Sequence, residues 1–369
     1  MRVKCINCGY VSQFTLENWC CACGTPWELA EYPIFSPDKI DQHNHSIWRY
    51  GYLMGLDIQT PIYKMGVGWT PLIPLNLYDR DVFIKLEYLS PSGSFKDRGV
   101  NAMVNQLVHM GVRTVVEDSS GNAGASVASH AARFGIRAEI YVPEYASSSK
   151  KNQIAIYGAV VKPIQGSRSA VEKAAQASIA PRRAYASHAY NPAYLAGQVT
   201  AAYELWEMLG GKAPDWIICP TSQGGLFLGY WFGFNSIMKA GFIEKMPRMI
   251  VAQPKLIAPI HNAFINGLNH IPEAHLEGMT VAEGAAIVKP VRDKRILQVL
   301  YETDGFTIAI EEDEILSAQA YLAEKGFYVE PTSALVTAGF KKIENQIPQD
   351  DIIVLPLTGN GLKGKPQLR

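Results

Sequence analysis

The residues PSGSFKDRG, 91–99, place a lysine between an aromatic side chain and an aspartate, after a run of small turn-forming residues. Apolar residues at helical spacing follow, so Lys96 is expected at the N-terminus of a helix. The helix dipole penalises an ammonium group there, which favours the neutral amine. Schiff-base and general-base chemistry need that neutral amine, with a pKa lowered from about 10.4 toward about 7–8. The sequence predicts this chemistry for Lys96; the alternative is a lysine whose stem lies on the surface and whose charge lies in water.

Two further loops follow expected strands and contain mostly small residues. TSQGGLFLG, 221–229, has glycines that let backbone N–H groups converge at a helix start, which suits a phosphate dianion. SSGNAGAS, 119–126, offers Asn122 as a donor to an aromatic oxygen, and hydroxyls and amides for a substrate carboxylate. Taken singly, each loop is better explained as an ordinary tight turn or helix cap.

The N-terminal segment carries five of the six cysteines. Cys5, Cys8, Cys20 and Cys23 form two C-x2-C pairs, each followed by glycine. Four thiolates can bind a structural Zn²⁺ ion and hold a segment too small to have its own core. Cys21 is a competitor for one ligand position, and free or redox-active thiols are the alternative. Cys219 is expected to be an inert, buried strand residue.

Short apolar strand patterns alternate with helical patterns after residue 80, beginning with VFIKLE at 82–87. Such alternation predicts an α/β fold with parallel sheets flanked by helices. Ligands bind such folds in the loops at the carboxyl ends of the strands. The loops at 91–99, 119–126 and 221–229 are therefore the predicted site.

Composition restricts the partners. The chain has 369 residues, enough for two sizeable domains, and 34 Lys+Arg balance 34 Asp+Glu. No overall charge draws it to nucleic acid or to an anionic membrane. The sequence has no signal-peptide pattern and no apolar run of about 18 residues. We expect a cytoplasmic protein that acts on a small molecule.

PSGSFKDRG, SSGNAGAS, the glycine-rich turn and LTGNGLKG occur in an order that resembles the pyridoxal-phosphate (PLP) enzymes of the tryptophan-synthase-β fold, fold type II. CINCG, CCACG, WRY at 48–50, GWTPLIPL at 68–75 and EPTSALVTAGF at 330–340 make the chain similar to the threonine synthase family over essentially its whole length. The resemblance implies two three-layer αβα domains with PLP between them. The expected division is a zinc-ribbon-like knuckle at 1–35, a large domain from 36–81 and 186–369, and a smaller mobile domain at 82–185. A homodimer is implied as well.

The resemblance also assigns roles to residues. Lys96 would bind PLP covalently and move protons; the other cofactor contacts would be Phe95, Asn122, Ser222, Gln223, Gly224, Gly225, Leu226 and Thr358. Thr358 would meet the pyridine nitrogen with a neutral hydroxyl, which does not enforce a protonated ring. The implied substrate contacts are Ser94, Ser120, Gly121, Ala123, Ser126, Lys150, His188, Tyr194 and Glu283.

The substrate half departs from the family pattern. Threonine synthases usually read close to NPYRLEGQ where this chain has NPAYLAGQ at 191–198, so Tyr194 replaces an arginine that helps bind the substrate phosphate. His188 stands where asparagine is common. If Lys150 and Arg292 supply charge instead, the chain converts O-phosphohomoserine and water to threonine and phosphate. The alternatives are β-replacement on O-phosphoserine or a similar ester, as in cysteate-synthase-like enzymes, a threonine- or serine-type ammonia-lyase, and an inactive binding protein.

Overall fold

The computed structural model describes residues 1–146, 148–274 and 278–364, except for the side chains of residues 149 and 150. The chain divides into two compact units. Unit 1 contains Met1–Gly68 and Ser90–Thr200, and unit 2 contains Trp69–Leu89 and the chain from Ala201 onward.

This division differs from the expected one in four segments. Residues 36–68 and 186–200 belong to unit 1, residues 82–89 belong to unit 2, and the N-terminal 1–35 is part of unit 1. The segment 36–68 joins unit 1 through hydrogen bonds to its first long helix: Trp48 Nε1 donates to Asn101 Oδ1 at 2.7 Å, and the Ile62 N–H donates to Asn105 Oδ1 at 2.8 Å. Residues 82–89 join unit 2 because their strand pairs with the strand at 353–356.

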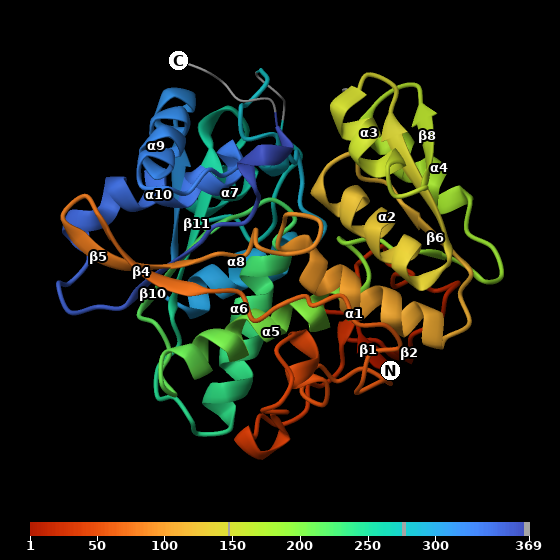
Figure 1. Cartoon of the computed structure of the whole chain (residues 1–369), viewed down its shortest axis with the longest axis horizontal. Coiled ribbons are helices and arrows are strands. Elements are labelled where there is room, and N and C mark those ends of the chain that lie inside the picture. The colour runs from red at the N-terminus through yellow and green to blue at the C-terminus, as the bar shows by residue number, and fades with distance from the viewer. Residues whose placement is uncertain (147, 275–277, 365–369) are drawn as a thin grey trace. The chain divides into compact units, whose positions relative to one another are not determined.

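Unit 1 is built on a four-stranded parallel sheet in the order β8-β7-β6-β9. Its strands are β6 (Thr114–Glu117), β7 (Arg137–Pro143), β8 (Val160–Ile164) and β9 (Arg183–Tyr185). The helices between them are α2 (Asn122–Phe134), α3 (Ser148–Ala155) and α4 (Arg168–Ala177), and α1 (Lys96–His109) precedes β6 and packs on α2 (Figure 1). The strand–helix alternation predicted from the sequence is therefore confirmed here.

Unit 2 contains a six-stranded sheet in the order β12-β11-β10-β13-β5-β4, in which only the edge strand β4 is antiparallel. Its strands are β4 (Leu72–Leu77), β5 (Arg80–Lys85), β10 (Trp216–Pro220), β11 (Arg248–Pro254), β12 (Phe306–Ile310) and β13 (Ile353–Pro356). Its helices are α6 (Gly225–Lys239), α7 (Pro259–Ile265), α8 (Asp293–Glu302), α9 (Glu312–Glu324) and α10 (Pro331–Ile343). The α/β prediction holds for this unit too. The central strands are apolar on both faces, as Ile217, Ile218 and Val354 show, because helices such as α10 cover the sheet.

Helix α5 (Pro192–Met208) begins in unit 1 and ends in unit 2. Short 3₁₀ turns lie at Pro37–Lys39, Ile47–Tyr50, Lys255–Ile257, Glu283–Ala285, Glu344–Gln346 and Gly361–Lys363. No helix in the described parts of the chain is both long and apolar enough to cross a membrane.

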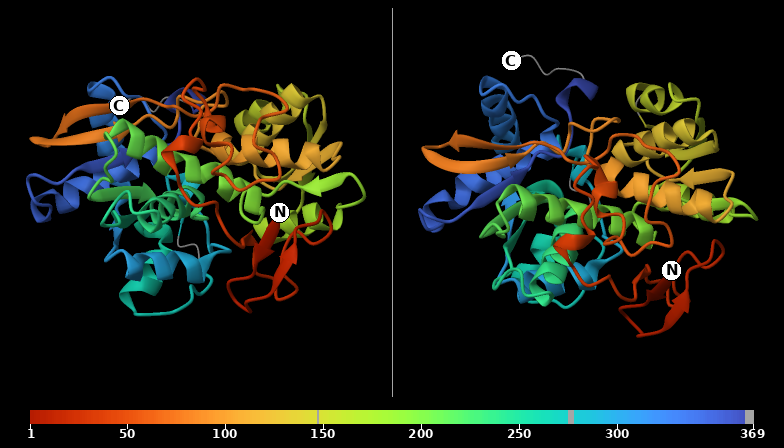
Figure 2. Two further views of the ribbon diagram at one scale, coloured as in Figure 1. Left: turned by 90° about the horizontal axis from the view of Figure 1, so that it is seen from below. Right: turned by 60° about the horizontal axis from the view of Figure 1, so that its bottom comes forward.

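The N-terminal segment of unit 1 forms a small antiparallel sheet of β1 (Arg2–Lys4), β2 (Val11–Gln13) and β3 (Glu28–Leu29), drawn in red near the N label in Figure 2. Its core is small: Val3, Phe14 and Trp27 pack with two cysteines. So few apolar residues cannot stabilise a module of this size alone.

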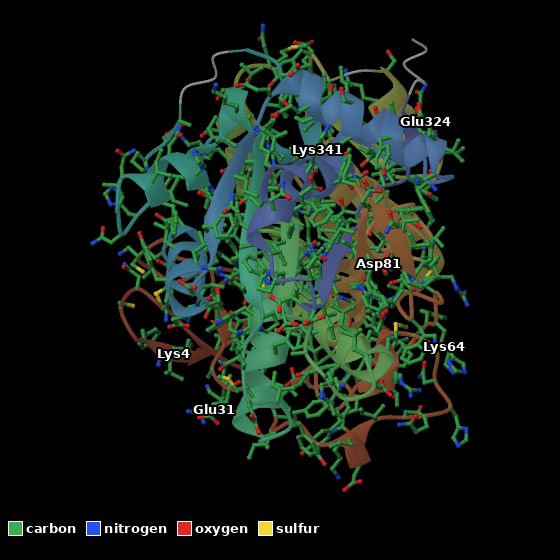
Figure 3. The ribbon with its side chains drawn as sticks, turned by 90° about the vertical axis from the view of Figure 1, so that its left-hand side faces the viewer. Lys4, Glu31, Lys64, Asp81, Glu324 and Lys341 are labelled. Carbon is green, nitrogen blue, oxygen red and sulfur yellow. The ribbon has the colours of Figure 1, made fainter. Side chains whose placement is uncertain are left out.

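Unit 2 also has a well-packed edge at the β4–β5 hairpin. Figure 3 labels Asp81 on this hairpin, and its carboxylate accepts a hydrogen bond of 2.9 Å from Asn76 Nδ2. Figure 3 also labels Lys341 on α10, whose Nζ lies 5.1 Å from the centroid of the Tyr78 ring at the turn of the hairpin. The hairpin is thereby attached to α10.

Candidate active site

Lys96 is the first residue of α1, as the sequence predicted. Its Nζ lies 4.5 Å from the centroid of the Phe95 ring. Burial lowers the pKa of Lys96 from 10.5 to about 8, while the charge of Glu117 acts in the opposite direction. Desolvation, rather than the helix dipole emphasised above, is therefore the main cause of the lowered pKa. A lysine with this pKa has a substantial neutral fraction near pH 8 and can act as nucleophile or base.

Asp97 fixes the turn from which Lys96 projects. Its buried carboxylate accepts hydrogen bonds from the Ser92 N–H at 2.7 Å, from Ser92 Oγ at 2.6 Å and from Ser126 Oγ. Ser126 therefore uses its hydroxyl hydrogen on Asp97. It has no donor left for the substrate carboxylate, and we assign it a role in holding the start of α1.

Two glycines allow α1 and α5 to approach closely. A Cβ atom on Gly99 would lie 2.4 Å from the Tyr194 ring, and one on Gly197 would lie 2.3 Å from the Arg98 carbonyl oxygen. Tyr194 is fully buried, its hydroxyl has no hydrogen-bond partner in the described part of the chain, and burial raises its pKa well above 10. The residue that replaces the family's arginine thus supplies neither a positive charge nor a negative one.

The SSGNAGAS loop runs from β6 into α2. The Gly121 N–H donates to Ser119 Oγ at 3.2 Å, and a Cβ atom on Gly124 would lie only 1.9 Å from the Ser119 carbonyl oxygen, so this turn requires glycine. The loop brings Ser120, Gly121 and Asn122 to the N-terminus of α2 and leaves them partly exposed, whereas Ala123 is buried. In the turn before α1, Ser94 Oγ is buried and has no hydrogen-bond partner among the described residues. A buried hydroxyl of this kind is available to a ligand.

Sequence reasoning missed two carboxylates at the end of β6. Glu117 is fully buried, and burial raises its pKa from 4.5 to about 7. It accepts a hydrogen bond from the His188 backbone N–H, and one of its oxygens lies 3.1 Å from His188 Nδ1. Asp118 binds Arg168 at 2.6 Å and the Tyr185 hydroxyl at 2.8 Å. The sequence feature that could have identified Glu117 and Asp118 is an acidic pair at the carboxyl end of a buried strand, directly before the SSGN loop.

The glycine-rich turn of unit 2 follows β10 and opens α6. Gly224 has a φ of +81° and precedes the first residue of α6, Gly225. Gln223 Oε1 accepts a hydrogen bond of 3.0 Å from the Val291 N–H, which fixes the turn. Ser222, Gln223 and Gly225 are partly exposed, whereas Leu226 is buried. The converging backbone N–H groups and the start of a 15-residue helix suit a phosphate group.

Thr358 lies just after β13 in unit 2. Its side chain is nearly buried, and its N–H donates to Ser333 Oγ at 2.7 Å. A Cβ atom on Gly359 would lie 2.0 Å from Glu330 Oε2, so a larger residue at this position would require the Glu330 side chain to move. Glu283, predicted to contact the substrate, begins a short exposed 3₁₀ turn in the same unit. The side chain of Lys150 lies outside the described residues.

Four cysteine sulfurs of unit 1 form a cluster, but the set differs from the predicted one. Cys5, Cys8, Cys21 and Cys23 have sulfur atoms within 4.8 Å of one another, so the cluster contains Cys21, the expected competitor, in place of Cys20. Cys20 forms an isolated strand-type bridge with Pro26, and adjacent residues of an extended segment point to opposite sides. Four thiols in this arrangement fit the tetrahedral coordination of Zn²⁺. Cys219 is fully buried on β10, and burial raises its pKa.

Comparison with known proteins agrees with these features. Residues 63–359 match the family model described as "Pyridoxal-phosphate dependent enzyme". The fold resembles that of maize serine racemase, with a TM-score of 0.68 and 23% identity over 79% of this chain and 88% of that one. The chain therefore belongs to the family of pyridoxal-phosphate-dependent enzymes.

Within this family the chain is similar to threonine synthases. It is 32% identical to the threonine synthase of Methanocaldococcus jannaschii over 98% of this chain and 93% of that protein. It is 35% identical to the threonine synthase of Synechocystis sp. over 83% of this chain and 79% of that protein. The predicted family and the α/β fold of the PLP enzymes are thus confirmed.

Proposed function

We propose that this protein converts O-phosphohomoserine and water to threonine and phosphate. The observation that carries the proposal is Lys96, a partly buried lysine of lowered pKa at the start of α1, in a chain similar to threonine synthases over nearly its full length. Lyases of this kind release phosphate from a phosphate ester.

Each unit contains residues whose chemical groups are suited to binding part of PLP. In unit 1, Lys96 would hold the cofactor covalently, Phe95 would lie beside it, and Asn122 would donate to its ring oxygen. In unit 2, the turn at 222–226 would hold its phosphate, and Thr358 would meet its ring nitrogen with a neutral hydroxyl. When bound, PLP would withdraw electrons from the substrate Cα, which makes the Cα–H and then the Cβ–H acidic.

The chain's own groups would move the protons. Lys96 would remove the proton from Cα and then one from Cβ, which drives phosphate off Cγ. A proton would then be added to Cγ, which becomes the methyl group of threonine. Water would then add at Cβ, and Lys96 would return a proton to Cα. The buried Ser94 hydroxyl and the N–H groups at the start of α2 would bind the substrate carboxylate.

One observation favours a second candidate. Around Lys96, unit 1 has two carboxylates at 117 and 118 and a neutral Tyr194 where a phosphate-binding cation is expected. An ammonia-lyase acting on serine or threonine needs no such cation, because its leaving group is uncharged. Replacement at Cβ of O-phosphoserine remains compatible only if a cation comes from elsewhere, such as Arg292 or Lys150.

The test is to incubate PLP-loaded protein with O-phosphohomoserine and to measure phosphate and the amino-acid product. The proposal expects threonine and phosphate in equal amounts, and no phosphate release from the K96A variant. Ammonia and a keto acid from serine or threonine, without phosphate release from the ester, would support the second candidate instead. Retained cofactor without turnover of any of these substrates would point to an inactive binding protein.

A structural zinc ion at Cys5, Cys8, Cys21 and Cys23 is the second part of the proposal, because the sulfur cluster suits that ion and the knuckle has a small core. A homodimer also remains a prediction from the family resemblance, and analytical ultracentrifugation of the holoenzyme would check it.

A further inference from the structure

The strand-end carboxylate Glu117 and the ring of His188 form a pair that the reaction outlined above does not use. Glu117 Oε1 lies 3.1 Å from His188 Nδ1 and also accepts from the Asp118 N–H at 3.1 Å, while Oε2 accepts from the His188 N–H at 3.1 Å. Glu117 is fully buried, whereas the side chain of His188 is 10% exposed. The ring is thus the end of the pair that a substrate or water can reach.

We propose that Glu117 and His188 form a second proton-carrying pair of the active site, in which His188 Nε2 is the atom that exchanges protons and Glu117 is the positioning partner. The proposal rests on the proposed function. In a neutral imidazole whose Nδ1–H donates to the carboxylate, Nε2 has a free lone pair. When Nε2 takes a proton, the Nδ1 proton can pass to Glu117, so that no buried imidazolium remains.

The charges around the pair favour this arrangement. Burial raises the pKa of Glu117 to about 7 and, with the charge of Lys96, lowers the pKa of His188 to about 3. A proton that the pair gains is therefore held on the Glu117 carboxyl rather than on the ring as an imidazolium. Groups that share a proton in this way titrate as a unit.

The ionisable groups around Glu117 and His188 do not take the proton that these two residues share. Arg168 binds the Asp118 carboxylate at 2.6 Å and acts on Glu117 only through its charge. Tyr185 and Tyr194 are neutral, because burial raises the pKa of each. No ion-pair partner other than His188 contacts Glu117 in the part of the chain that the structure describes.

The charges of Lys96 and of the Glu117–His188 pair also affect each other's pKa values. The charge of Glu117 raises the pKa of Lys96, and the charge of Lys96 lowers that of His188. The His188 ring lies edge-on to the Tyr194 ring, with centroids 6.1 Å apart, and Tyr194 packs on Gly99, three residues after Lys96. The pair is therefore attached to the helix that carries the lysine.

The proposed reaction has a step that this pair can serve. When water adds to Cβ, its O–H bond breaks and a C–O bond forms at Cβ. The released proton would move to Nε2 while the Nδ1 proton moves to Glu117 Oε1. Loss of the proton from Nε2 to solvent, with return of the carboxyl proton to Nδ1, restores the pair. Lys96 remains available for the protons of Cα and Cβ.

The experiment compares wild-type, E117Q and H188N holoenzymes with E139Q as the matched control. Glu139 is also a buried carboxylate of this sheet, but it binds Arg183 at 2.6 Å. The first readout is a pH titration of the visible absorbance of the bound cofactor, which needs no substrate. We expect E117Q to move its midpoint downward by about one pH unit, because a negative charge near the Lys96 nitrogen is lost. E139Q should leave the midpoint unchanged.

The second readout is the steady-state rate. With the substrate that wild type turns over, E117Q and H188N should lower kcat by about 10²–10⁴-fold with little change in KM, and E117D should recover part of the loss. If both variants keep the cofactor but shift neither the titration nor kcat, the pair is only structural and the proposal is overturned. If wild type does not use O-phosphohomoserine, the proposed function fails, while the substrate-free titration still decides whether Glu117 acts on Lys96.

Discussion

Two lysines, Lys85 and Lys96, show how environment alters the properties of a lysine side chain. Lys85 in unit 2 is fully buried, and its Nζ forms an ion pair with Glu204 at 2.9 Å. Lys96 in unit 1 has no ion-pair partner among the described residues, and burial lowers its pKa to about 8. Lys96 combines a lowered pKa with a position in one of the loops predicted to form the site.

The pKa of Lys96 predicts how cofactor loading depends on pH. Burial penalises the ammonium, so the reactive free amine appears as the pH rises through about 8 rather than through 10.5. The rate at which PLP attaches to the apo-protein should rise to about pH 8 and then level off. Stopped-flow absorbance measures this rate, with Nα-acetyl-lysine as the reference amine. A rate that keeps rising above pH 10, parallel to the reference, would show that the amine has an ordinary pKa.

At the scale of elements, the sequence predicted that Lys96 lies at the start of a helix. It did not predict the tertiary contacts that hold this helix in place. Strand–helix alternation and the loops at strand ends were readable because parallel strands and glycine-rich turns have local signatures. The Gly99–Tyr194 and Gly197–Arg98 contacts join segments about a hundred residues apart, and no local pattern encodes them. The same holds for Glu117, whose partner His188 comes from a distant segment.

The α1–α5 contact gives a prediction at this scale. In G197A the new Cβ atom would lie 2.3 Å from the Arg98 carbonyl oxygen, so α5 must shift from α1. We expect a loss of about 1–3 kcal/mol in the free energy of unfolding. Weaker retention of PLP should accompany it, because α1 carries Lys96.

G339A is the control for this variant. Gly339 lies inside α10, and its Cβ atom would meet neighbours at an ordinary 3.5 Å, so alanine should stabilise the helix slightly. Urea denaturation and dialysis against PLP-free buffer measure both effects. Equal stability of G197A and wild type would show that the two helices are not packed as described.

At the scale of the whole molecule, the class of fold and the family were predictable, whereas the division of the chain was not. The segments 36–68 and 82–89 each belong to a different unit from the one expected. Tertiary hydrogen bonds and strand pairing, rather than order in the sequence, decide where they pack. The knuckle shows the same limit: C-x2-C spacing suggested Cys20, but the extended backbone turns Cys21 toward the other thiols.

The knuckle leads to a prediction about metal content. C21S should lose the zinc ion and unfold the β1–β3 segment, since its core is too small to persist alone. C20S, one residue away, should keep one zinc ion per chain. Elemental analysis of both purified variants decides this. Zinc retained in C21S and lost in C20S would restore the ligand set expected from spacing.

The central claim is that Lys96 binds the cofactor, and it can be tested directly. The PLP-loaded protein is reduced with borohydride, digested and mapped by mass spectrometry. The account predicts the reduced cofactor on the peptide that contains Lys96 and on no other. Attachment at Lys85 or another lysine, or no attachment in a protein that still binds PLP, would contradict it.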